Sequence, residues 1–267
     1  MVYFVATPIG NLKDISYRAI ETLRGADVVF CEDTRHTLKL LNAYEIKKPL
    51  FACHKFNEKD AAERILEESR SGKQVVVVSD AGTPVVSDPG NVVCQVLKDA
   101  NEPYTIIPGA CACIAALVLS GLDAGRFTFV GFLPDKASEK KAVLEKFKDV
   151  QTTLLFHSAP QDVDKDLKCM YETFGERKCA AVREITKIHE ESVSFMLSAG
   201  LPGEKRGEYV LVVSGAEEKE NPLCDLSEKE HIKFYIDQGY DKKEALKRAA
   251  KDRGVSKSAL YPFAIDL

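Results

Sequence analysis

Short apolar runs alternate with segments of helical periodicity in the first 107 residues, and this alternation constrains the fold more than any other feature of the chain. The apolar runs are 2–6, 27–31, 75–79 and 104–107, and the helical segments are 14–24, 34–43, 58–70 and 91–100. Strands that alternate with helices are typical of an α/β domain with parallel strands. The run 75–78 is valine throughout, as expected of a central strand with helices on both faces. We therefore expect a largely parallel sheet, with a ligand site beyond the carboxyl ends of its strands.

A second series of elements follows Gly121. Its expected strands are 127–130, 152–157, 178–183 and 208–214, and its expected helices are 138–148 and 162–174. From Leu226 onward the pattern is helical, with Gly239 and Gly254 as helix stops and Ser256 as an N-cap. The predicted fold class is α/β, with domains at 1–120 and 121–222 and a small helical segment at 223–267.

Composition and charge narrow the class of protein. A chain of 267 residues that is 45% hydrophobic and 29% charged is typical of an ordinary globular protein. The apolar run from Cys111 has about 12 residues, whereas a membrane-spanning helix needs about 20, and the N-terminus lacks the pattern of a signal peptide. The eight cysteines include no C-x-x-C pair. We expect reduced thiols, a cytoplasmic protein and no metal site.

The net charge of −4 conceals an uneven distribution. Residues 242–257 contain seven basic and two acidic side chains, a charge of +5, which leaves −9 for the rest of the chain. This segment is a candidate contact for an RNA backbone through Lys243, Lys247, Arg248 and Lys251. The alternative is a solvated helix face that packs through Ala245, Leu246, Ala249 and Leu260.

Two loops follow predicted strands and are rich in small residues, at 79–90 and 108–113. Such loops expose backbone N–H and C=O groups, and two of them on neighbouring strands would form a pocket suited to an adenosyl group. The alternative for 79–90 is a long turn with Pro89 as the first residue of a helix. No G-x-G-x-x-G or G-x-x-x-x-G-K-[ST] motif is present, so a standard dinucleotide site and a P-loop are unsupported.

Several segments together resemble the tetrapyrrole methylase superfamily, and more narrowly its branch that methylates a cytidine ribose 2′-hydroxyl in bacterial 16S ribosomal RNA. The matching segments are 5–12, 32–37, 78–84, 87–90, 183–191 and 206–213. The resemblance implies S-adenosylmethionine bound in a cleft between the two α/β domains of a homodimer, with the small ribosomal subunit as substrate. The residues that it implies for cofactor binding are Pro8, Gly10, Asp80, Gly82, Thr83, Cys111 and Ala112.

The chain departs from that branch at three places. Thr83 replaces the aspartate found in many relatives, Cys111 replaces a serine, and 156–162 reads Phe-His-Ser-Ala-Pro-Gln-Asp instead of Phe-Tyr-Glu-Ser-Pro-His-Arg. The third departure leaves open an RNA-binding ribosome-assembly factor that has lost turnover. C-methylation of a tetrapyrrole is a further alternative.

Two polar clusters supply candidate catalytic residues. Glu184, Lys187 and His189 follow a strand of the second domain and provide the types of side chain that can help to remove a hydroxyl proton. Glu32 and Arg35 follow a strand of the first domain, and Arg35 is also a candidate phosphate contact. The alternatives are a solvated charged turn for the first cluster and a helix cap, formed by Asp33 or Thr34, for the second.

Overall fold

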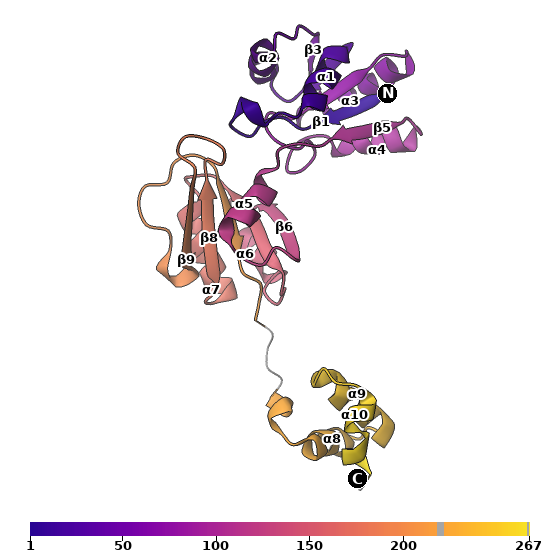
Figure 1. Cartoon of the computed structure of the whole chain (residues 1–267), viewed down its shortest axis with the longest axis vertical. Helices are drawn as coiled ribbons and strands as arrows, with labels where there is room; N and C mark the ends of the chain where they lie inside the picture. The colour runs from indigo at the N-terminus through magenta and orange to yellow at the C-terminus, as the bar shows by residue number, and fades with distance from the viewer. Residues whose placement is uncertain (218–221, 266) are drawn as a thin grey trace. The chain divides into compact units, whose positions relative to one another are not determined.

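The computed structural model describes residues 1–217, 222–265 and 267, and the chain divides into two compact units, 1–216 and 217–267. The first unit contains two five-stranded sheets (Figure 1). The second unit is helical. No helix among the described residues is long and apolar enough to span a membrane.

The first sheet is entirely parallel, with strand order β3-β2-β4-β1-β5. Its strands are β1 (Val2–Val5), β2 (Val28–Cys31), β3 (Leu50–Ala52), β4 (Val75–Val78) and β5 (Tyr104–Ile107). Its helices are α1 (Tyr17–Gly25), α2 (Thr34–Ala43), α3 (Glu58–Arg70) and α4 (Asn91–Asp99), and a 3₁₀ turn covers Leu12–Asp14. The predicted parallel α/β architecture is confirmed.

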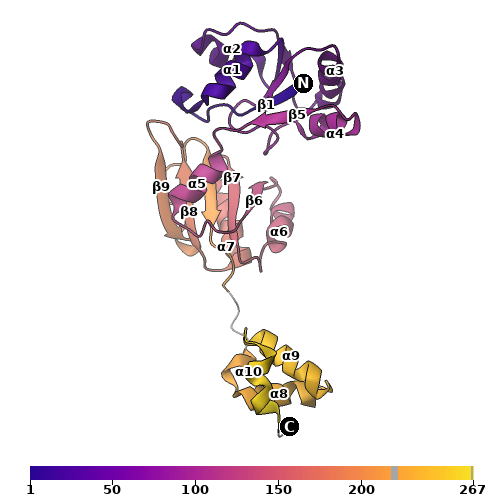
Figure 2. The same ribbon diagram turned by 45° about the vertical axis from the view of Figure 1, so that its right-hand side comes forward.

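The four valines of β4 show why this strand is apolar throughout. Val75 and Val77 pack against α3 and α4, whereas Val76 and Val78 pack against α1 and α2. Figure 2 shows the two helix pairs on opposite faces of the sheet. Because successive side chains of a strand point to opposite faces, each valine is buried beneath one helical layer.

The second sheet is mixed, with order β6-β7-β10-β8-β9. Its strands are β6 (Phe127–Phe132), β7 (Thr153–Ser158), β8 (Lys178–Arg183), β9 (Glu191–Met196) and β10 (Tyr209–Val213). Helices α6 (Ala137–Glu145) and α7 (Val163–Phe174) cover one face, α5 (Ala112–Ser120) covers the other, and a 3₁₀ turn spans Leu197–Ala199. Only β6 and β7 pair in parallel, and the other three pairings are antiparallel.

The C-terminal unit contains α8 (Glu228–Asp237), α9 (Lys242–Asp252) and α10 (Lys257–Ala264), after a 3₁₀ turn at Pro222–Asp225. The three helices bury a common core of Ile232, Leu246, Leu260 and four alanines. Ser256 caps α10 as predicted, because its side chain accepts a hydrogen bond from the Ala259 N–H. Gly239 and Gly254 follow α8 and α9 with positive φ, so both predicted stops are confirmed.

Three expectations about the first sheet and its loops need correction. The loops 79–90 and 108–113 follow β4 and β5, but these strands are not neighbours, because β1 pairs with both. Pro89 is not the first helical residue: α4 begins at Asn91 with Gly90 as N-cap, where φ of +135° suits glycine. Helix α5 lies within the predicted first domain in sequence but packs on the second sheet.

Candidate functional site

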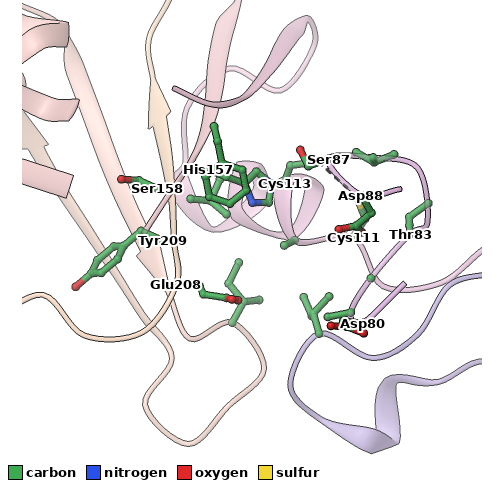
Figure 3. A pocket seen from close by; sticks show the side chains of 18 of the residues that line it. Asp80, Thr83, Ser87, Asp88, Cys111, Cys113, His157, Ser158, Glu208 and Tyr209 are labelled. Atoms are coloured by element: carbon green, nitrogen blue, oxygen red, sulfur yellow. Dashed lines mark hydrogen bonds between the residues drawn. The ribbon is translucent and has the colours of Figure 1, made fainter. Parts of the chain in front are cut away.

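One cavity, called the first cavity, lies where the carboxyl ends of β4 and β5 face the second sheet. Its volume is about 310 Å³. Figure 3 shows side chains from both sheets around it. From the first sheet and α5 its lining includes Ile9, 80–83, 86–88 and 111–113, and from the second sheet it includes Phe132, 157–159, 184–185, Lys187 and 208–210.

Strand register explains why residues from distant parts of the second sheet meet at this cavity. Tyr209, the first residue of β10, is paired with Ser158 at the end of β7 and with Arg183 at the end of β8. The residues that flank these positions therefore lie at one edge of the sheet. The Glu184 N–H donates to the Glu208 carbonyl over 3.4 Å, which joins the β8 and β10 ends directly.

The loop after β4 is held against its neighbours by backbone and side-chain hydrogen bonds. Thr7 and Gly82 exchange two backbone hydrogen bonds of 2.8 and 3.0 Å, and Gly82 has φ of +80°. The Thr83 hydroxyl donates to the Ala110 carbonyl over 3.1 Å. The two loops are thus brought together across β1, although their strands are not neighbours.

A second cavity, of about 650 Å³, adjoins the first. It contains Thr7, Pro8, Gly10 and Leu12 from the β1 loop, His36, Lys39 and Leu40 from α2, and Gly207. Six residues line both cavities: Ile9, Asp80, Ala81, Glu184, Lys187 and Glu208. The predicted cofactor residues therefore divide, with Pro8 and Gly10 in the second cavity, Asp80 in both, and Gly82, Thr83, Cys111 and Ala112 in the first.

Glu184 and Lys187 form an ion pair in the loop that connects β8 to β9. The Lys187 ammonium donates to Glu184 Oε1 over 2.9 Å, and this contact lowers the pKa of Glu184. Glu184 has φ of +50°, a left-handed conformation that is uncommon outside glycine. Two glycines make room for the pair, since a Cβ at Gly10 would lie 2.6 Å from Lys187 Cγ and one at Gly207 would lie 2.3 Å from Glu184 Oε1.

Carboxylates concentrate at the first cavity, whose lining includes Asp80, Asp88, Glu184 and Glu208. Burial, with smaller contributions from the neighbouring Asp80 and Glu208, raises the pKa of Asp88 to about 6. Burial also raises the pKa of Glu32, with additional contributions from Asp80 and Asp88. The Asp80 carboxylate accepts a hydrogen bond from the Asp33 N–H over 3.0 Å, which ties the loop after β4 to the loop after β2.

Three predicted catalytic residues line neither cavity. His189 is exposed in the β8–β9 loop, and Glu32 is half-buried beside the first cavity. The Arg35 side chain is 88% exposed and paired with Asp33 over 2.7 Å. Asp33 also caps α2 by accepting from the Arg35 N–H over 2.8 Å, so the cap predicted as an alternative is confirmed.

The first cavity also contains residues that were not among the predicted site residues, including Ser87, Asp88, His157, Ser158 and Glu208. Asp88 lies in the matching segment 87–90, in the loop that follows the buried strand β4. Its carboxyl group at that position could have identified it as a site residue from the sequence. His157 and Ser158 were singled out only as departures from the family pattern. Their position in the cavity depends on the pairing of β7 with β10, which the sequence does not specify.

Ser158 belongs to a buried polar network beneath the cavity. Its hydroxyl donates to Asp166 Oδ2 over 2.6 Å, and the other Asp166 oxygen forms an ion pair with Lys140. Both charged side chains are only 4% exposed. A glutamate at position 158, as in the related branch, would place a second carboxylate against buried Asp166, so the serine suits this network. Burial lowers the pKa of the neighbouring His157.

The four predicted RNA contacts near the C-terminus all lie on α9. Lys243, Lys247 and Lys251 recur at intervals of four residues, which places them on one face of the helix, opposite the buried Ala245 and Ala249. Lys247 and Arg248 form ion pairs with Glu244, at 3.6 and 3.4 Å. In the described part of the chain, no group of three or more histidine, cysteine or acidic side chains is arranged to hold a metal ion.

Comparison with curated proteins finds close relatives over nearly the whole chain. It is 40% identical to the ribosomal RNA small subunit methyltransferase I of Bacillus subtilis, over 98% of this chain and 92% of the relative. It is 37% identical to the protein of the same name from Haemophilus influenzae, over 99% of this chain and 96% of the relative.

Solved structures share the fold at lower sequence identity. The methyltransferase CobJ matches with a TM-score of 0.62 and 20% identity, over 80% of this chain and 94% of that one. The uroporphyrin-III C-methyltransferase of Thermus thermophilus in complex with S-adenosylhomocysteine matches with a TM-score of 0.56 and 20% identity, over 79% of this chain and 96% of that one. A family model matches residues 1–199. The resemblance inferred from the motifs is therefore confirmed: the chain belongs to the family of tetrapyrrole (corrin/porphyrin) methylases.

Proposed function

We propose that this protein transfers a methyl group from S-adenosylmethionine to the ribose 2′-hydroxyl of a cytidine in 16S ribosomal RNA. The observation that carries the proposal is the Glu184–Lys187 pair, which lies in the lining shared by the two cavities. Relatives of 37–40% identity named ribosomal RNA small subunit methyltransferase I support the same class of substrate.

The first cavity fits S-adenosylmethionine in size and charge. Its volume of about 310 Å³ lies within the range of small-molecule sites. The sulfonium and ammonium groups of the cofactor are cationic, and four carboxylates line this cavity. The lining also includes residues with little or no side chain, namely Ala81, Gly82 and Ala112. Their backbone groups are therefore accessible to the adenosyl group of the cofactor. Asp80, Gly82, Thr83, Cys111 and Ala112 would hold the cofactor here.

The second cavity fits the acceptor nucleotide. It is the larger of the two and carries Lys39 and His36 in addition to Lys187. Basic side chains are the usual contacts of ribose-phosphate backbones. We place the target ribose in this cavity, with Gly10 and Pro8 beside it.

When bound, the cofactor supplies an electrophilic methyl group, so the protein has to hold the acceptor oxygen in line with it at about 3–3.5 Å. Glu184 remains ionised because Lys187 lowers its pKa, and its carboxylate can accept the hydrogen bond of the ribose hydroxyl. This carboxylate would take the hydroxyl proton as the ribose oxygen bonds to the methyl carbon and the carbon–sulfur bond of the cofactor breaks. Lys187 and the constricted space at Gly207 hold Glu184 in position.

The assembly and location of the protein belong to the same proposal. We propose a cytoplasmic homodimer that acts on the small ribosomal subunit, with the cofactor cleft between domains 1–120 and 121–222 and an RNA contact in 223–267. Exposed apolar side chains on β5 and α5 support a partner surface, namely Tyr104, Ile106, Ile114, Val118 and Leu119. Val118 is 72% exposed, although α5 contains no charged residue, and exposed apolar patches of this kind often mark interaction surfaces.

The test is methyl transfer from labelled S-adenosylmethionine to isolated small subunits, free 16S RNA or a porphyrin precursor. We expect label in the RNA of the small subunit, at a ribose. Label only in the porphyrin would indicate C-methylation. Binding of the RNA without transfer of label would indicate an assembly factor that has lost turnover.

The roles of Glu184 and Lys187 are tested separately from cofactor binding. Glu184→Gln and Lys187→Ala should each lower turnover at least about tenfold, equivalent to 1.4 kcal/mol in the barrier, while the Kd for S-adenosylhomocysteine changes little. His189→Ala is the matched control, since His189 lies in the same loop but lines neither cavity. Turnover at the wild-type level in both variants would remove the pair from the reaction.

A further inference from the structure

Two thiols lie side by side in the lining of the first cavity. The sulfur atoms of Cys111 and Cys113 are 3.4 Å apart, and both residues line the cavity (Figure 3). Cys111 is the N-cap of α5 and is half-buried, whereas Cys113 lies in the first helical turn and is 5% exposed. Cys111 is among the residues proposed to hold the cofactor, but neither thiol takes part in the chemistry of the proposed methyl transfer.

The surroundings of the two thiols give them different reactivity. The Cys113 thiol, together with backbone N–H groups of the first turn of α5, lowers the pKa of Cys111. The same contact and burial raise the pKa of Cys113. A thiolate at a helix N-terminus is the typical form of a reactive cysteine, because the N–H groups stabilise its charge. Cys94 and Cys169, by contrast, have pKa values raised by burial.

We propose that Cys111 and Cys113 form an oxidation site, at which hydrogen peroxide converts the two thiols to a reversible disulfide that weakens cofactor binding. The Cys111 thiolate attacks an oxygen of the peroxide, the O–O bond breaks, and the released hydroxide becomes water. The resulting sulfenic acid is attacked by the Cys113 sulfur, its S–O bond breaks, and its hydroxyl leaves as water with the Cys113 proton. Two thiols lose two hydrogen atoms in total, and the peroxide is reduced to two waters.

The disulfide would change the cavity because a sulfur–sulfur bond is about 2.05 Å long, well below the present separation of 3.4 Å. Cys113 is buried in the core between α5 and the second sheet, whereas Cys111 is only partly buried against that core, so we expect Cys111 to make most of the movement. Cys111 directly follows Ala110, whose carbonyl accepts the hydrogen bond of Thr83. Closing the disulfide therefore moves the strand–helix connection that holds the proposed cofactor loop. This consequence rests on the proposed function, whereas the oxidation itself does not.

Mass spectrometry of the full chain tests the oxidation directly. The reduced protein is treated with a small excess of hydrogen peroxide, alkylated with iodoacetamide and digested with trypsin. The peptide 99–126 contains Cys111 and Cys113 and no other cysteine. We expect this peptide to lack two hydrogen atoms and to remain unalkylated, and dithiothreitol to restore two alkylation sites. Full alkylation of this peptide while Cys94 or Cys224 is oxidised would overturn the proposal.

Variants assign the two roles. Cys113→Ser should retain a sulfenic acid on Cys111 that a dimedone reagent traps, whereas Cys111→Ser should leave Cys113 unreactive. Cys224→Ser is the matched control, because Cys224 is also half-buried but lies in the C-terminal unit, and its variant should form the disulfide at the wild-type rate. Equal trapping at position 113 in Cys111→Ser would contradict the assignment.

Calorimetry with S-adenosylhomocysteine then tests the consequence for the cofactor. The oxidised protein should bind about tenfold more weakly than the reduced protein, and dithiothreitol should restore the affinity. Equal affinities of the two forms would overturn this part of the proposal. If the reduced protein does not bind the ligand at all, the proposed function fails, and the mass measurement still decides whether the thiols form a disulfide.

Discussion

Gly10 leaves space for the side chain of Lys187, and a methyl group does not fit between them. A Cβ at position 10 would lie 2.6 Å from Cγ and 2.9 Å from Cε of Lys187. Because the lysine side chain is flexible, Gly10→Ala should displace it at a cost in stability within about 1 kcal/mol. Displaced Lys187 no longer holds Glu184, so turnover should fall at least about tenfold. Urea unfolding and the methyl-transfer assay measure the two effects.

A double-mutant cycle identifies the cause of that loss. In a Lys187→Ala background the side chain that Gly10 accommodates is absent, so Gly10→Ala should have little further effect on turnover. If the losses of the two variants multiply instead, the effect of Gly10→Ala does not pass through Lys187.

Asp88 gives stability a predictable dependence on pH. Burial raises its pKa in the folded protein to about 6, whereas an unfolded aspartate titrates near 4. Between these values the folded chain binds more protons than the unfolded chain, so this group lowers stability as pH rises from about 4 to 6. Asp88→Asn removes the effect. The free energy of unfolding of Asp88→Asn, relative to that of the wild type, should increase by about 1 kcal/mol between about pH 4 and 6. This is less than the full pKa shift would give, because solvent screens a group that is only half-buried.

Urea unfolding at pH 4.5 and 7 measures the change. Asp135→Asn, at an exposed carboxylate outside both cavities, is the control and should show no such trend. A stability difference for Asp88→Asn that is constant with pH would contradict the raised pKa.

Helix α9 carries the basic stripe of Lys243, Lys247 and Lys251. Each phosphate contact that is lost should reduce the slope of log K against log salt by about 0.7–0.9. The triple alanine variant should therefore bind 16S RNA more weakly, with a salt slope reduced by up to about 2–3. Filter binding over a range of salt concentrations measures it. The control is the double variant Lys73→Ala and Lys98→Ala. These lysines precede β4 and β5, at the amino ends of the strands, whereas the cavities lie at the carboxyl ends. An unchanged slope in the stripe variant would favour a merely solvated helix face.

Elements with a clear hydrophobic period were predictable, and those without one were not. The strands β1, β2, β4 and β5 and their helices follow from the alternation of apolar runs. Helix α5 was not predicted, because its nine residues contain no charge and therefore show no polar face. Strand β3 has only three residues, and β9 exposes most of its side chains, so neither forms a distinct apolar run.

Site residues were predictable from the sequence when they belong to a single loop. Asp80, Gly82 and Thr83 lie in a loop that directly follows the central strand, so its position follows from the sheet. His157 and Glu208 are about 50 residues apart, and they meet only through the antiparallel register of β7 and β10. Sequence patterns indicate that a strand exists but not which strand it pairs with, which is why these residues were not identified as site residues.

The net charge of −4 combines an acidic first unit with a basic helix in the C-terminal unit. The first cavity, with its four carboxylates, lies in 1–216, and the basic α9 lies in the C-terminal unit, which has a hydrophobic core of its own. A phosphate backbone would be repelled by the carboxylates of the first cavity and attracted by α9. The proposed division assigns the cationic cofactor to the acidic part and RNA affinity to the basic part.

Removal of 217–267 tests this division. All four cores of the first unit lie within 1–216, so the truncated chain should unfold cooperatively and bind S-adenosylhomocysteine with an unchanged Kd. Its kcat/KM on small subunits should fall at least about tenfold, mainly through KM, because the lost basic contacts contribute to binding. Saturating substrate should therefore recover most of kcat. A truncated chain with wild-type kcat/KM would show that the C-terminal unit does not contribute to recognition of RNA, whereas loss of cofactor binding would show that the first unit depends on it.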